Sequence, residues 1–61
     1  MNRVVEILMK RDDLTQEEAQ AIFNDVQAQL EEAAETGSYA LCEEIMYDEL
    51  GLEMDYLLDI L

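Results

Sequence analysis

Histidine, tryptophan and proline are absent from this 61-residue chain, which has one cysteine and two glycines. Without histidine, a zinc site would depend on cysteine and carboxylate ligands, and no serine or cysteine nucleophile would have an imidazole base. Paired carboxylates can perform acid–base chemistry, but they need a concave pocket that separates their pKa values, which a few short helices seldom form. We therefore expect no enzymatic activity, no metal site and no cofactor.

The lone cysteine, Cys42, cannot form an intramolecular disulfide, and the chain lacks the covalent bridges typical of small secreted domains. No apolar run approaches the ~20 residues of a membrane-spanning helix. The first residues carry charges at Arg3 and Glu6 and no signal-peptide cleavage site. These features favour a reducing cytoplasm, with Cys42 as a small buried hydrophobic residue.

Basic residues are absent from position 12 onward. Arg3, Lys10 and Arg11 lie with Glu6 in the first eleven residues, whereas residues 12–61 contain fifteen Asp and Glu and no Lys or Arg. The formal net charge of −13 argues against direct binding to nucleic acid or to anionic membranes, both of which require a basic surface.

What the chain does have is apolar surface at helical spacing. Hydrophobic residues make up 51% of it, enough for a small core in one domain covering residues 1–61. The pattern predicts an all-α bundle of three to four short helices. The expected helices are residues 2–10, 16–36, 39–50 and 54–61.

Local signals define the two central helices. Thr15 and Glu18 form a potential capping box, Ser38 can cap the next helix, and Gly37 and Gly51 can end helices in the left-handed conformation. Glu49 is the one charged residue that projects toward the apolar side of its helix, so either it lies at the edge of an interface or the helix ends early. The apolar sides are predicted to contain Ala19, Ile22, Phe23, Val26, Leu30 and Ala33 in one helix and Leu41, Cys42, Ile45, Met46 and Leu50 in the other.

The terminal helices are apolar over more of their circumference than one packing partner can cover. Either they meet within one monomer, or they form a self-complementary patch that is buried in a two-fold homodimer. We expect the dimer, because so short a chain readily gains core by oligomerising. The residues that would form dimer or core contacts are Val4, Val5, Leu8, Tyr56, Leu57 and Ile60.

Three explanations account for the acidity: solubility, adaptation to a salt-rich cytoplasm, or a surface that binds a basic partner. Carboxylates three or four residues apart on a helix lie ~5–6 Å from one another, comparable to successive phosphates of a nucleic-acid strand. Such a surface can enter the basic channel of a nucleic-acid-binding protein. Tyr39 and Tyr47 either add contact area there or cover the core. The candidate contacts are Glu17, Glu18, Asp25, Glu31, Glu32, Glu35, Glu43, Glu44 and Asp48.

Residues 7–19 (ILMKRDDLTQEEA) and 51–61 (GLEMDYLLDIL), with Gly37 marking the middle turn, resemble small acidic helical proteins of bacteriophages and prophages, most of them uncharacterised. The resemblance covers nearly the whole chain, but its motifs are helix starts and stops. It implies a viral protein, and small acidic phage proteins often inhibit host machinery, including restriction and CRISPR systems, in some cases as DNA mimics.

The expected function is therefore binding and inhibition of a host protein, with a defence protein as one class of target, through a DNA-mimic-like acidic face. The alternative is a homodimeric helical structural or regulatory module whose acidity serves only solubility.

Overall fold

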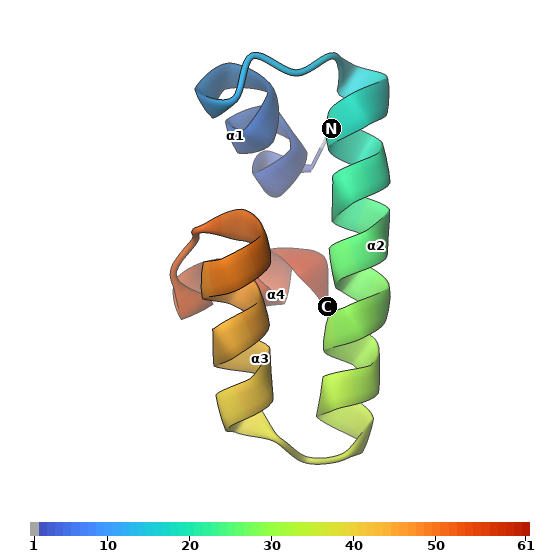
Figure 1. The fold of residues 1–61 in the computed structure, drawn as a ribbon, viewed down its shortest axis with the longest axis vertical. Coiled ribbons are helices and arrows are strands. Elements are labelled where there is room, and N and C mark those ends of the chain that lie inside the picture. Colours follow the sequence, from blue (N-terminus) through green and yellow to red (C-terminus); the bar gives the residue numbers. More distant parts are fainter. Residues whose placement is uncertain (1) are drawn as a thin grey trace.

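The computed structural model describes residues 2–61, within which the chain forms helices and no strand (Figure 1). Two of the helices, α2 and α3, form an antiparallel hairpin, with α1 beside the N-terminal half of α2. The elements in chain order are α1 (Arg3–Arg11), α2 (Gln16–Glu35), α3 (Tyr39–Ile45), the π-helical turn η1 (Met46–Leu50), the 3-10 turn η2 (Met54–Tyr56) and α4 (Leu57–Ile60).

Helix α2 begins and ends as the sequence predicts. The Glu18 backbone N–H donates to Thr15 Oγ1 at 3.1 Å, and the Thr15 backbone N–H donates to Glu18 Oε1 at 2.9 Å, which completes the capping box. At the other end, Gly37 adopts φ +74°, where a side chain would be strained. The tight turn that follows returns the chain along α2 as α3, whose first turn is capped by Ser38.

The helix expected over residues 39–50 is not α-helical throughout. It changes at Met46 into a π-helical turn and ends at Gly51, which has φ +65°. The wider i→i+5 turn keeps both Met46 and Leu50 buried and leaves Glu49 exposed. Of the two explanations for Glu49, the early end of the α-helix is confirmed, because α3 ends at Ile45 and Glu49 lies exposed in the π-helical turn.

The C-terminal helix expected over residues 54–61 is also interrupted. A 3-10 turn at Met54–Tyr56 precedes the short helix α4. In 3-10 geometry residues i and i+3 project in the same direction. The turn thereby directs Met54 to the same side as Leu57 at the start of α4, and both are half-buried.

The chain ends meet within one monomer. Helix α1 contacts both α2 and α4, which explains how its wide apolar surface is covered. The Asn2 Nδ2 amide donates to the Asp59 backbone carbonyl at 2.6 Å, and Gln27 of α2 donates to the Ile60 carbonyl at 2.8 Å. Of the six residues predicted to make dimer or core contacts, Val4, Val5, Leu8 and Ile60 are buried in the monomer, and Tyr56 and Leu57 are half-buried.

The core lies between α2 and the other helices, and it includes Cys42, as predicted. Two residues assigned to the apolar sides are more exposed than expected: Ile22 is 37% exposed and Leu41 is 42% exposed. Each lies at the edge of its helix's buried stripe, where the neighbouring helix does not reach. The buried residues are Val4, Val5, Leu8, Ala19, Phe23, Val26, Leu30, Ala33, Cys42, Met46, Leu50, Leu52 and Ile60.

Candidate acidic interaction surface

All nine predicted contact carboxylates are exposed on α2, α3 and η1. Within residues 2–61, the two ion pairs are Arg3 with Asp59 at 2.6 Å and Arg11 with Asp12 at 3.0 Å, and neither includes any of these nine. The nine carboxylates therefore carry negative charge that no cation of the described chain neutralises.

The acids of α2 form two rows on its solvent side. At about 100° per residue, the six acids of α2 spread over roughly 140° of its solvent side. Glu18, Asp25 and Glu32 project toward the side on which α3 lies, whereas Glu17, Glu31 and Glu35 project toward the far side. Helical periodicity alone separates these acids from the core and arranges them in two rows, and the structure places α3 beside the row that contains Glu32.

Two of the nine have roles inside the molecule. The carboxylate of Glu18 accepts the capping-box hydrogen bond from the Thr15 backbone N–H, and this bond, with a smaller contribution from the Thr15 side chain, lowers the pKa of Glu18. Asp25 accepts a hydrogen bond from Gln29 Nε2 at 3.1 Å, one helical turn away. Both are held in place before any partner binds.

The basic residues gather at α1 and adjoining segments. The Arg3 guanidinium lies 4.6 Å from the centroid of the Tyr56 ring, in addition to its ion pair with Asp59. Arg11 Nε and Nη2 donate to the two carboxylate oxygens of Asp12, which lowers the pKa of that carboxyl group. Two of the three bases are thus engaged within the chain, Arg3 with Asp59 of α4 and Arg11 with Asp12.

Tyr39 and Tyr47 lie at the surface of α3 and η1, at 67% and 59% exposure. Of the two alternatives for these side chains, covering the core is wrong. Both rings are available to a partner that approaches the hairpin.

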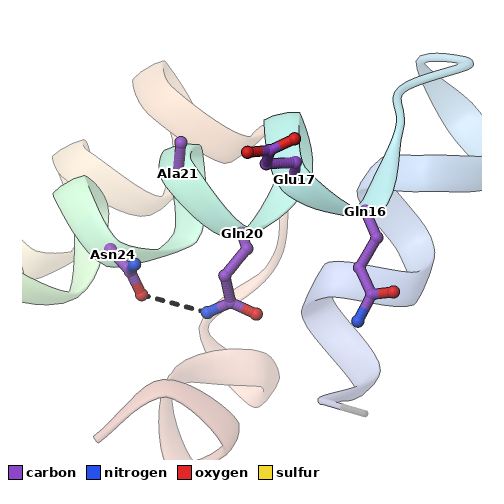
Figure 2. Close-up of a pocket in the computed structure, with 5 residues that line it drawn as sticks. All are labelled: Gln16, Glu17, Gln20, Ala21 and Asn24. Carbon is purple, nitrogen blue, oxygen red and sulfur yellow. Dashed lines mark hydrogen bonds between the residues drawn. The ribbon is translucent and has the colours of Figure 1, made fainter.

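Two depressions mark the surface of α2. The first is shallow and is lined by Gln16, Glu17, Gln20, Ala21 and Asn24, all from the same helix (Figure 2). Gln20 Nε2 donates to Asn24 Oδ1 at 3.0 Å along its floor. One exposed helix surface provides no opposing wall, so this depression does not enclose a ligand.

The second depression is a groove between α2 and α3. Gln29, Glu32, Ala33 and Thr36 form one wall, and Leu41 and Ile45 form the other. Sequence reasoning had placed Leu41 and Ile45 in the core and gave no role to Gln29 or Thr36. The short turn at Gly37 indicates that the two helices are antiparallel neighbours, and it is the one sequence signal for this groove. The sequence of either helix alone does not indicate on which side of α2 helix α3 packs.

No group of three or more Cys, Asp or Glu residues in the described chain, residues 2–61, is arranged to hold a metal ion. None of the helices in that range has the length and apolar character required to cross a membrane. Comparisons of the chain with protein-family models, curated proteins and solved structures find no match. The resemblance to small acidic phage proteins therefore stays a prediction.

Proposed function

We propose that this is a small phage-type protein that acts in the bacterial cytoplasm by binding and inhibiting a host protein through the acidic α2–α3 hairpin. The observation that carries the proposal is the set of nine exposed carboxylates without a cationic partner among residues 2–61. A surface that needed acids only for solubility would interleave both signs and gain i,i+4 pairs. Here that stabilisation is absent throughout residues 12–61.

The physical basis is electrostatic. Rows of carboxylates at ~5–6 Å spacing resemble the charge of a nucleic-acid backbone, so a basic channel can accept them in place of nucleic acid. Association would be fast and would weaken with added salt, because exposed charges are screened. A nuclease or another nucleic-acid-binding defence protein is the class of target that this chemistry fits.

The test is a pull-down from a bacterial lysate at low ionic strength, followed by elution with a salt gradient and, separately, with duplex DNA. We expect a retained protein that elutes with moderate salt and with DNA. A partner that stays bound at high salt and is indifferent to DNA would contradict the electrostatic mechanism.

Charge-removal variants make the test specific. Replacing Glu17, Glu32 and Glu44, which sample both rows of α2 and helix α3, by Gln should reduce binding to the retained partner while leaving the helical circular dichroism spectrum intact. The matched control removes the same charge elsewhere, with Glu6→Gln, Glu53→Gln and Asp55→Asn, all at exposed positions outside α2 and α3. Equal losses in both triple variants would show that net charge alone matters and would favour the solubility alternative.

A homodimeric interaction module is the second candidate. Its support is the C-terminal end, where Leu58 is 88% exposed and Leu61 is 52% exposed. Since Val4, Val5 and Leu8 are already buried in the monomer, a dimer would use these two leucines in their place. Light scattering at micromolar concentration should then give twice the mass of 7.0 kDa, and Leu58→Gln should restore the monomer. A monomer mass for the unaltered protein would exclude this dimer.

A further inference from the structure

The groove between α2 and α3 differs chemically from the rest of the acidic surface, because its floor is apolar. Ala33 is buried at its base, Ile45 is half-buried, and Leu41 is 42% exposed along its wall. Leu41 and Ile45 therefore remain partly uncovered beside α2, whereas Ala33 beneath them is closed off from solvent. Burial of this surface by a partner would be favourable.

The rim of the groove is negatively charged. Glu32 lines it directly, Asp25 is hydrogen-bonded to the lining residue Gln29, and Glu44 is exposed next to Ile45. No basic residue occurs in residues 12–61 to neutralise this rim. When an apolar side chain of a partner enters the groove, the partner residues on either side of it therefore lie near these carboxylates.

The negative charge of the rim determines which kind of segment can bind in the groove. A second copy would bring another −13, and its C-terminal leucines are flanked by Asp55 and Asp59. The chain's one segment that is both apolar and basic is α1, whose Val4, Val5 and Leu8 are already buried against α2 and α4. A segment of another protein that carries an apolar residue between Lys or Arg residues can pack against the apolar floor and pair with the carboxylates of the rim.

We infer that this groove binds one apolar side chain of a basic helical segment of the partner, with flanking Lys or Arg side chains paired to Glu32 and Glu44. The inference rests on the proposed function and narrows it. The partner surface would then be an amphipathic basic helix rather than a channel that contacts phosphates alone, and recognition would follow the helix-in-groove mode.

Two synthetic peptides of about 14 residues, long enough for a marginal helix, provide the probes. One has Lys residues with Leu at i, i+3, i+4 and i+7, and the other has Ala in place of every Leu. Binding is measured by calorimetry at low ionic strength, and the site is located by amide chemical shifts. We expect the Leu peptide to bind more tightly, with the largest shifts in residues 29–36 and 41–45.

Matched variants distinguish the contribution of the apolar floor to peptide binding from that of the charged rim. Leu41→Gln should weaken binding of the Leu peptide by about tenfold, whereas Leu58→Gln, at an exposed position on α4, should leave it unchanged. Glu32→Gln should weaken binding more than Glu31→Gln, which removes the same charge from the adjacent residue on the far side of α2. Thermal melting of each variant verifies that it is folded.

The outcomes distinguish this inference from the proposed function. Equal affinity for the Leu and Ala peptides, or equal effects of Glu31→Gln and Glu32→Gln, would overturn the groove and leave the acidic surface as a purely electrostatic binder. Failure of both peptides to bind at low ionic strength would overturn the proposed function itself. Concentration-dependent shifts in residues 29–36 and 41–45 without peptide would mean that a second copy occupies the groove, which also overturns the inference.

Discussion

Thr15 and Glu18 show how one pair of residues performs two tasks. Their reciprocal hydrogen bonds satisfy backbone N–H groups at the start of α2, and the one that the Glu18 carboxylate accepts is strengthened when Glu18 is ionised. The same carboxylate belongs to the candidate interaction surface. A partner that pairs with Glu18 would therefore compete with the cap, which makes Glu18 a weaker candidate contact than its neighbour Glu17.

The capping box predicts a specific pH dependence. Hydrogen bonds from Thr15 lower the pKa of Glu18 in the folded state, so the folded protein binds fewer protons than the unfolded chain near that pKa. The stabilisation is fully present above the unfolded pKa of Glu and is lost as pH falls through the lower folded value. Denaturant melts between neutral and acidic pH should show this loss.

Two variants verify the assignment. Glu18→Gln should remove this part of the acid sensitivity, while Glu17→Gln, which removes an equivalent exposed charge from the same turn, should retain it. Thr15→Ala should lower the free energy of unfolding by about 1 kcal/mol at neutral pH. An unchanged acid profile in Glu18→Gln would refute the role assigned to this carboxylate.

At the scale of the element, the short helix α4 stabilises the fold through one face. Ile60 is buried against the core together with α1, whereas Leu58 projects into solvent. The ion pair between Arg3 and Asp59 spans the same contact, but it is exposed, and such pairs contribute at most ~1 kcal/mol. Apolar burial is therefore the main reason that the chain ends stay together.

Substitutions at Leu58 and Ile60, both in α4, test this difference in burial. Ile60→Ala should destabilise the monomer by about 2–4 kcal/mol, since it removes buried methyl groups and leaves a cavity beside α1. Leu58→Ala should change the free energy of unfolding by less than about 0.5 kcal/mol. Chemical denaturation monitored by circular dichroism at several protein concentrations measures both. Equal effects would indicate that Leu58 is buried in solution, as in the dimer alternative.

At the scale of the whole molecule, the dominant feature is the uncompensated charge. The net charge of −13 is carried by a body whose longest dimension is 33 Å. Repulsion over these distances acts against the folded state, which holds the carboxylates closer together than the unfolded chain does. The core must outweigh this repulsion, and it contains thirteen buried hydrophobic residues.

Added salt should therefore stabilise the fold. The Debye length is about 30 Å at 0.01 M salt, which is nearly the 33 Å length of the molecule, and it falls to about 8 Å at 0.15 M. At the higher salt concentration, carboxylates on different parts of the molecule therefore no longer repel one another strongly. We expect the melting temperature to rise over this range of sodium chloride, and to rise less in a variant with Glu31, Glu35 and Glu43 replaced by Gln. A melting temperature that is indifferent to salt would mean that repulsion among these carboxylates is negligible.

The sequence by itself determined the features that depend on residues three or four positions apart. The capping box of Thr15 and Glu18, the left-handed stops at Gly37 and Gly51, the burial of Cys42 and the separation of acids from the core all follow from local geometry. The segregation of charge is likewise a property of the sequence, because no fold can supply the missing bases of residues 12–61.

Only the tertiary structure decided which surfaces meet. It placed α1 against α4 within one monomer, inserted the π-helical turn that exposes Glu49, and left Leu41 beside an open groove. It also placed α3 beside one of the two rows of carboxylates on α2. These outcomes depend on contacts between residues that are distant in the chain. Several helices can pack against the same apolar surface, and the helical periodicity of one segment does not tell which of them will do so.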